Sequence, residues 1–397
     1  MGSMRVLVVR LLCVFALCLL LLGYYEFSVL FKPPQRPLVI QEQNLRFDNN
    51  VQQHLVSTSS LTIVSVGDIT HFNYIYQQVV FWMGSLSVVI SISKKDEELL
   101  SSMVQSSLFP ARVIVTPFEN EMDSFPINTL RNIGYNTVTS THVLVLDLDV
   151  LPSPSLYSSF LSLPLSALSD DNLAIVLPLF EMNSYSIPCT NWYSCQEQYS
   201  HLYDLTKYDL KMGITTGACK ELGHNGVNQY MNSKWYSQPI TNPLVPYQCW
   251  ANLQQQPFVI VRHSAQVPLF YDKLVDHGRN RLEWINHLRY RGFHFSLLTQ
   301  SWLYHLRHSS QEVTGSRAYQ NSMIFENRES ELSEKYQGHW MLPLCNIKTE
   351  SHSSPSSMSV TKVIEKPGRE KVKKLSRDEE IVRKFAKRRE QLKNKKH

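Results

Sequence analysis

The alternation of short apolar runs with longer stretches of mixed polarity between residues 61 and 148 is the feature that most constrains the fold. Runs rich in Val, Ile and Leu predict strands at 61–67, 86–92, 111–117 and 142–148. The stretches between them predict helices at 72–83, 95–108 and 126–138. Strands separated by helices of this length indicate parallel pairing with right-handed crossovers. A further amphipathic helix is expected at 281–290, and the whole is expected to form one α/β domain.

The strand expected at 142–148 ends in two acids one residue apart, Asp147 and Asp149. In an extended segment, side chains at positions i and i+2 share a face, so the two carboxylates would point the same way. Two like charges side by side are unfavourable unless a cation separates them. Ligands of such sheets bind at the carboxyl ends of the strands, and Mn²⁺ or Mg²⁺ prefers carboxylate oxygens. The pair therefore predicts a metal that binds a diphosphate. The simpler interpretation is a strand that ends in solvated acids.

A metal site of this kind needs a further ligand from elsewhere in the chain. The segment "LLTQSWLYHLRHSS", residues 297–310, supplies His305, with His308 as the second choice. The competing interpretation is a histidine that is satisfied within the core.

The stretch "SFPINTLRNIGYNTVTSTHVLVLDLDVLPSPSLY" resembles the signature region of the LARGE-type glycosyltransferases, family 49. Similar motifs follow in the same order, namely "AIVLPLFEMNSY", "GHNGVNQYMNSKW", "PYQCW", "PFVIVRHSAQVPLFYDKLVDHGRNR" and "LTQSWLYHLRH". The chain is most similar to single-domain members such as the β-1,4-glucuronyltransferase. The resemblance implies a GT-A fold, which is a Rossmann-like mixed α/β sheet flanked by helices in a single catalytic domain. It also implies a UDP-sugar donor, a bound Mn²⁺ and inversion at the anomeric carbon.

The same resemblance implies roles for individual residues. The metal ligands would be Asp147, Asp149 and His305. The residues that bind the donor or substrate would be Asn128, Arg131, Asn132, Glu181, His224, Asn228 and Asn280. Arg131 could instead form an ordinary salt bridge. Three extra residues separate Asn228 from the tryptophan of that motif, and "LVDHGRNR" departs from the family pattern, so the acceptor pocket is expected to differ.

An inverting transfer needs a base on the acceptor hydroxyl. We expect Asp272, which precedes the Gly-x-Asn-Arg motif, to be this base, with Asp276 as the next candidate and Glu283 as a further rival. The competing interpretation of Asp272 is a turn or cap residue.

The ends of the chain differ from its middle. We expect a cytoplasmic tail at 1–4, a transmembrane signal anchor at 5–30, a stem at 31–60, the catalytic domain at 61–345 and a basic tail at 346–397. This order predicts a single-pass type II protein of the Golgi membrane with a lumenal catalytic domain. A cleaved signal peptide is the alternative for the first apolar segment.

Charge and cysteines limit the remaining possibilities. The net charge of +5 comes largely from the last fifty residues, and the near-neutral body argues against nucleic-acid binding. Cys189 and Cys195 could close a small disulfide loop or be buried free thiols. The predicted function is metal-dependent transfer of a sugar, glucuronic acid by the family's habit, from a UDP-sugar to a glycan or glycoprotein acceptor. The alternative is an inactive, membrane-anchored protein that binds glycans or acts as a scaffold with the same fold.

Overall fold

The computed structural model describes residues 59–185, 189–224, 227–228, 235–239, 241–276, 278–307, 316–337 and 342–345. All of them belong to one unit of the chain, Gln52–His397. Within this described part, no helix has both the length and the apolar character that crossing a membrane requires. The anchor predicted at 5–30 and the tail predicted at 346–397 lie outside the described residues, as does the stem predicted at 31–60 apart from its last two positions.

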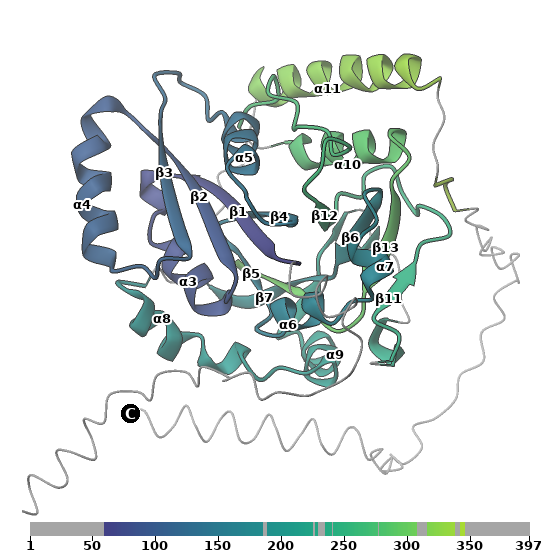
Figure 1. The fold of residues 1–397 in the computed structure, drawn as a ribbon, viewed down its shortest axis with the longest axis horizontal. Coiled ribbons are helices and arrows are strands. Elements are labelled where there is room, and N and C mark those ends of the chain that lie inside the picture. Colours follow the sequence, from purple (N-terminus) through teal and green to yellow (C-terminus); the bar gives the residue numbers. More distant parts are fainter. Residues whose placement is uncertain are drawn as a thin grey trace, which may run out of the picture. The chain divides into compact units, whose positions relative to one another are not determined.

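An eight-stranded mixed sheet forms the centre of the domain (Figure 1). Its strands, in spatial order, are β11 (Leu244–Pro246), β13 (His294–Leu298), β6 (Leu173–Leu177), β12 (Phe258–Arg262), β4 (His142–Asp147), β1 (Leu61–Asp68), β2 (Ser85–Ile92) and β3 (Val113–Glu119). Strands β4, β1, β2 and β3 are parallel, while β12 runs antiparallel to both β4 and β6. The mixed α/β sheet predicted from the sequence is thus confirmed.

Helices provide the crossovers between the parallel strands. These are α3 (Tyr74–Phe81), α4 (Glu97–Ser107) and α5 (Ile127–Asn136). Every strand and helix predicted between residues 61 and 148 is present, with its ends shifted by at most two residues. Helix α5 packs directly on β1 and β2, and Gly134 makes this approach possible, because a Cβ there would lie 2.4 Å from Cγ1 of Val64.

The remaining α-helices follow β4 in the sequence. They are α6 (Leu156–Leu161), α7 (Leu165–Leu168), α8 (Trp192–Gln198), α9 (Lys207–Thr216), α10 (Asn280–Tyr290) and α11 (Ser316–Lys335). Helix α10 was predicted at 281–290 as an amphipathic helix, but it is buried on all sides, with only Arg281 partly exposed. Helix α11 packs against it (Figure 1).

A second sheet of four short strands was not predicted. Its order is β5 (Val150–Pro152), β14 (Leu303–Arg307), β7 (Leu179–Tyr185) and β8 (Cys219–Glu221). Strand β14 is antiparallel to β5 and parallel to β7. Because β5 begins three residues after β4 ends, the chain passes from one sheet to the other at the acid pair.

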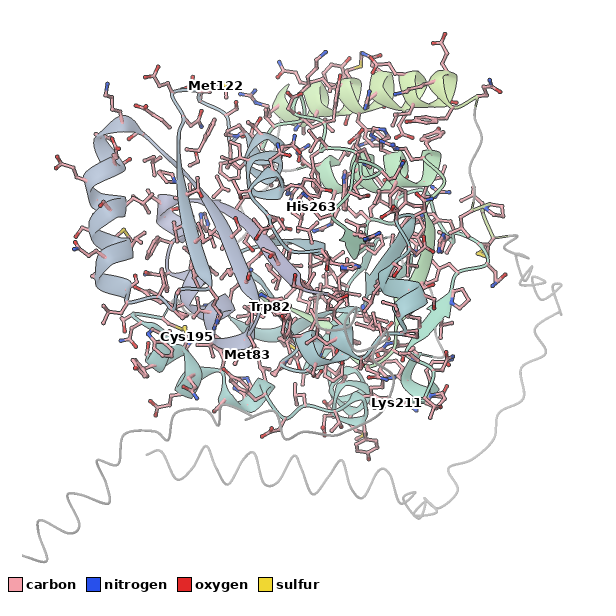
Figure 2. All side chains as sticks on the ribbon, viewed as in Figure 1. Trp82, Met83, Met122, Cys195, Lys211 and His263 are labelled. Carbon is pink, nitrogen blue, oxygen red and sulfur yellow. A yellow bond between two sulfur atoms is a disulfide. The ribbon has the colours of Figure 1, made fainter. Side chains whose placement is uncertain are left out.

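The described residues include two disulfides, Cys189–Cys195 and Cys249–Cys345, and Cys219, which is a buried free thiol. Of the two alternatives for Cys189 and Cys195, the structure has the disulfide. Figure 2 labels Cys195 and Trp82 in the same part of the domain. Trp82 is almost fully buried, and its indole N–H donates to the carbonyl of Ser85 at 2.8 Å.

Candidate active site

The acid pair lies in a tight turn that joins the two sheets. Strand β4 ends at Asp147, the turn occupies Leu148 and Asp149, and β5 begins at Val150. The two acids were expected to share one face of an extended strand, but regular strand geometry stops at the first of them. The buried amide of Gln78, on α3, fixes the turn by donating to the carbonyls of Asp147 and Val150, each at 3.1 Å.

Asp147 is held by two arginines. Arg131 on α5 reaches one carboxylate oxygen through Nη2 at 2.7 Å, and Arg281 on α10 reaches the other through Nη1 at 3.1 Å. Burial alone would raise the pKa of Asp147, but the charges of Arg131 and Arg281 outweigh it and hold the pKa below its ordinary value. Asp147 is therefore ionised at neutral pH and belongs to a compact charge cluster.

Asp149 faces a different partner. Its Oδ2 lies 3.1 Å from Nε2 of His305, a residue 156 positions later on β14. Strand pairing accounts for this contact, because β14 places His305 opposite Val150 of β5 and opposite Glu181 of β7. Nδ1 of His305 lies 3.8 Å from Glu181, whose other oxygen pairs with Nζ of Lys220 at 2.9 Å.

The side chains around the acid pair offer part of a ligand set for a divalent cation. Asp149 and His305 offer one carboxylate and one imidazole in direct contact, both of which are ligand types that Mn²⁺ accepts. Among the described residues, no group of three or more His, Cys, Asp or Glu side chains is arranged to hold a metal ion. The third predicted ligand, Asp147, directs both oxygens to guanidinium groups. Asp149 and His305 thus lie close enough to share a metal ion, whereas both oxygens of Asp147 are engaged by arginines.

The three asparagines predicted to bind the donor form hydrogen bonds with a loop of the protein. Asn128 donates to the carbonyl of Tyr271 at 2.8 Å, and Asn132 exchanges two hydrogen bonds of 2.8 Å with the backbone N–H and C=O of Phe270. Asn280, the first residue of α10, donates to the carbonyl of Leu274 at 3.1 Å. These three side chains face the loop at residues 268–276, which carries both predicted bases.

The two candidate bases differ in their surroundings. Asp272 is exposed at a turn in this loop. Asp276 accepts a hydrogen bond from the N–H of Phe125 at 2.6 Å and pairs with Arg317 at 3.2 Å. It also has a φ of +56°, an unusual conformation for a residue with a side chain. These contacts give Asp276 a structural task and leave Asp272 as the accessible carboxylate.

Glu283, the further rival, is fully buried on α10 and contacts Arg328 at 3.1 Å, so an acceptor cannot reach it. Burial raises its pKa to about 7, although Arg328 lowers it.

The remaining predicted residues are only partly visible. His224 and Asn228 belong to β9 (Gly223–His224) and β10 (Val227–Asn228), which pair with each other, and their side chains lie outside the described residues. His308 also lies outside them.

Three residues of the site were missed at the level of sequence. In the sequence, Arg281 was noted only as the basic residue of "GRNR". The pattern did not predict its ion pair with Asp147. Gln78 and Lys220 carried no signal, because each acts on a group that only the folded chain brings near.

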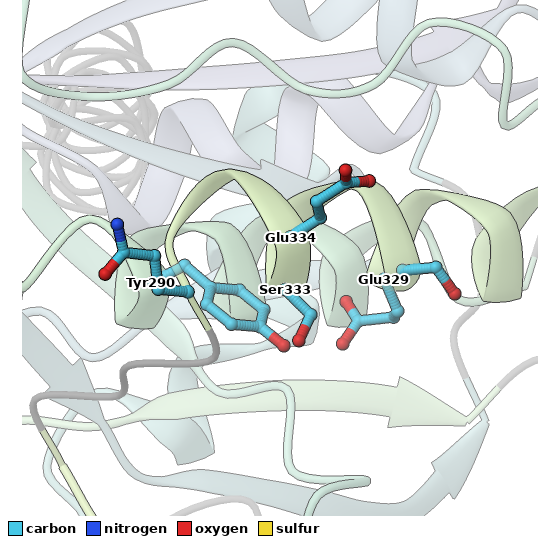
Figure 3. Close-up of a pocket in the computed structure, with 6 residues that line it drawn as sticks. Tyr290, Glu329, Ser333 and Glu334 are labelled. Carbon is cyan, nitrogen blue, oxygen red and sulfur yellow. The ribbon is translucent and has the colours of Figure 1, made fainter.

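A cavity of about 690 Å³ lies elsewhere, on the surface of α11 (Figure 3). It is lined by Tyr290, Glu329, Ser330, Ser333, Glu334 and Gln337. In the close-up, Tyr290, Ser333 and Glu329 direct their oxygens toward the same space. None of the predicted site residues lines it, so the acid pair and this hollow are separate features.

Much of the chain matches a known protein family. Residues 106–337, more than half of the chain, match the model of a family described as glycosyl-transferase for dystroglycan. The chain is 23% identical over 265 residues to the xylosyl- and glucuronyltransferase LARGE1 of Mus musculus, which covers 64% of this chain and 33% of that protein. It is 25% identical over 219 residues to beta-1,4-glucuronyltransferase 1 of Danio rerio, which covers 54% and 48% respectively. The matched part thus spans between a third and a half of these curated relatives.

Among solved structures, the chain is similar to GalNAc-T7 with UDP, GalNAc and Mn²⁺. The TM-score is 0.42 at 10% identity, and the match covers 72% of this chain and 55% of the other.

Proposed function

We propose that this chain, which belongs to the family described as glycosyl-transferase for dystroglycan, moves a sugar from a UDP-sugar to a glycan or glycoprotein acceptor. The transfer depends on a divalent metal, inverts the anomeric carbon and uses glucuronic acid as the sugar. Two curated relatives named as glucuronyltransferases support the choice of donor.

The contact between Asp149 and His305 gives the main support for a metal-dependent transfer. Asp149 and His305, 156 residues apart in sequence, meet at 3.1 Å at the carboxyl end of β4. Ligands of α/β sheets bind at this edge. A carboxylate and an imidazole that face each other here are suited to a cation that binds a diphosphate.

Asp149 and His305 are the residues that would hold Mn²⁺ or Mg²⁺, and Asp147 is the third residue of the predicted set. When bound, the metal supplies a Lewis acid that stabilises the leaving diphosphate. A carboxylate oxygen of Glu181 lies 3.8 Å from the other ring nitrogen of His305, which adds a second negative charge beside the imidazole.

The acceptor side of the reaction is assigned to Asp272. Its carboxylate takes the proton of the acceptor hydroxyl while the acceptor oxygen bonds to the anomeric carbon. The bond between that carbon and the diphosphate oxygen breaks on the opposite face, and UDP leaves with the electron pair. Exposure of Asp272 on a loop that α5 and α10 hold in place supports this assignment.

We place this activity in the Golgi lumen, with the chain anchored through residues 5–30. Two disulfides support a lumenal environment, since such bonds form and persist in oxidising compartments. Protease protection of the full chain in sealed Golgi vesicles should leave the domain at 61–345 intact. Digestion of that domain without detergent would contradict the orientation.

The activity itself is tested by UDP release from a panel of UDP-sugars with Mn²⁺, in the full chain and in Asp149→Asn. We expect metal-dependent release with UDP-glucuronic acid and its loss in the variant. Absence of metal-dependent turnover with every donor and acceptor, together with retained glycan binding, would favour the inactive binding protein.

A further inference from the structure

The two acids of the turn form their described ion pairs with different side chains. Asp147 meets only guanidinium groups of α5 and α10 among its described ion pairs, and Asp149 meets His305 of the second sheet. We infer that Asp147 is a positioning residue that fixes the loop at 268–276, while Asp149 serves the metal. The assignment of Asp149 rests on the proposed function, whereas the assignment of Asp147 stands on contacts within the protein.

Arg281 is immobilised by three different contacts. Its Nη1 binds Asp147 at 3.1 Å, its Nε donates to the carbonyl of Gln256 at 2.9 Å, and its guanidinium carbon lies 3.7 Å from the centre of the Phe258 ring. The side chain is only 19% exposed. Arg281 therefore fixes the first turn of α10 relative to Asp147.

Arg131 makes the equivalent connection to α5. Its Nη2 binds Asp147 at 2.7 Å, its Nη1 donates to Asn128 at 3.2 Å, and its guanidinium lies 5.2 Å from the centre of the Phe270 ring. The side chain is 5% exposed. Asp147 thus joins two helices through two guanidinium groups that are largely shielded from water.

Both helices then hold the same loop by its backbone. The donors and the carbonyls that they bind are Asn132 to Phe270, Asn128 to Tyr271, Asn280 to Leu274 and Trp284 to Pro268. The Phe270 ring also stacks on Trp284, with centroids 4.5 Å apart. The four carbonyls belong to a loop without regular secondary structure, so its shape depends on these side chains.

A metal at Asp147 would have to compete with both arginines. Removal of the carboxylate would leave two positive charges, mostly shielded from solvent, without their counter-ion. Asp149 instead contacts His305, an imidazole that is itself a suitable ligand for the same cation. The geometry therefore separates two acids that the sequence motif treats as equivalent.

Hydrogen exchange of the full chain can test the positioning role, because Asp147→Asn and Asp149→Asn are the same chemical change two residues apart. In Asp147→Asn, we expect exchange of the backbone amides in 268–280 to accelerate by about tenfold or more, a typical result of local opening. In Asp149→Asn, the same amides should keep their wild-type rates. Equal acceleration in both variants, or none in Asp147→Asn, would overturn the inference.

Mn²⁺ binding gives the second readout. It is measured from the loss of the electron paramagnetic resonance signal of the free ion. Asp149→Asn and His305→Ala should lose binding, and Asp147→Asn should retain it within about threefold while its kcat falls. Loss of Mn²⁺ from Asp147→Asn to the same degree as from Asp149→Asn would also overturn the inference. If the wild-type chain itself bound no Mn²⁺, the metal-dependent function would fail, and the exchange rates would still decide the role of Asp147.

Discussion

The two sides of the candidate active site are held in place by different means. On one side, Asp149, Glu181 and His305 stand on or beside strands, and backbone pairing sets their register. On the other side, the loop at 268–276 has no strand, and asparagine and tryptophan side chains bind its carbonyls. Position on the strand side is therefore encoded by backbone pairing, and position on the loop side by a few individual side chains. Substitutions of single residues should affect the two sides differently.

The largest effect on turnover is expected when a predicted metal ligand on the strand side is replaced. Asp149→Asn or His305→Ala should lower kcat by about 1000-fold, because about 4 kcal/mol of charge stabilisation at the leaving group is lost. The measurement is UDP release with Mn²⁺. The melting temperature should change little, since the strand pairing remains.

Asp171→Asn is the matched control, since Asp171 is an exposed acid paired with Arg262 far from the turn in sequence. Its kcat should equal that of the wild type. A similar loss in this control would mean that the assay reports stability.

The next effect concerns the helix that supports the loop. Burial raises the pKa of Glu283 to about 7, from an ordinary value of 4.5, so the folded protein holds this proton more tightly than the unfolded chain does. The contribution of Glu283 to stability should therefore be present at pH 5 and should be lost as the pH rises to 8. Between pH 5 and pH 8, we expect the free energy of unfolding of Glu283→Gln to rise by about 2 to 3 kcal/mol relative to that of the wild type. Urea unfolding at both pH values measures it.

His287 provides a control of opposite sign on the same helix. Burial lowers its pKa to about 3, so its stabilising contribution is complete above pH 6.5 and is lost as the pH falls. The free energy of unfolding of His287→Gln should therefore rise relative to that of the wild type as the pH falls. Parallel pH profiles of the wild type and the two variants would show that neither group is buried as described.

The loop side should also depend on Asn132 itself. Asn132→Ala removes both hydrogen bonds to Phe270, and we expect a loss of about 2 kcal/mol in the free energy of unfolding. Turnover should fall as well, because Asp272, the proposed base, lies two residues after Phe270 in the same loop. Asn136→Ala, at an exposed position of the same helix, is the control. Equal effects of the two substitutions would remove the distinction between supporting and surface asparagines.

The smallest effect is expected for a supporting side chain on the strand side. Lys220 pairs with Glu181 at 2.9 Å but is 61% exposed, so Lys220→Ala should cost less than about 1 kcal/mol of stability. The register of β14 against β7 should remain, and Mn²⁺ binding with it. A destabilisation as large as that of Asn132→Ala would show that the strand side also depends on single side chains.

The elements near the acid pair could be predicted because their signals are local. Continuous apolar runs identified β1, β2 and β4, and a proline near the first turn marked the start of α5. The placement of Asp149 near His305 also agrees with the resemblance to a family, although their metal-binding role stays a prediction.

The support of the loop could not be predicted, because side-chain bonds to distant carbonyls leave no pattern in sequence. Asn128 and Asn132 were assigned to the donor because of their motif, whereas in the structure they bind backbone 138 to 143 positions away. The second sheet was missed for a related reason. A strand of three residues such as β5 has too few positions to show a period.

The disulfide Cys249–Cys345 joins two half-cystines that lie 96 positions apart in the chain. It closes a ring that contains Asp272, Arg281 and His305 and leaves Asp147 and Asp149 outside. A protease that cuts the backbone once within this ring releases no fragment, since both new ends remain tethered through the disulfide. Such a nicked molecule would run as one species without reductant and as two with it, and until reduction both halves of the site would stay on one molecule.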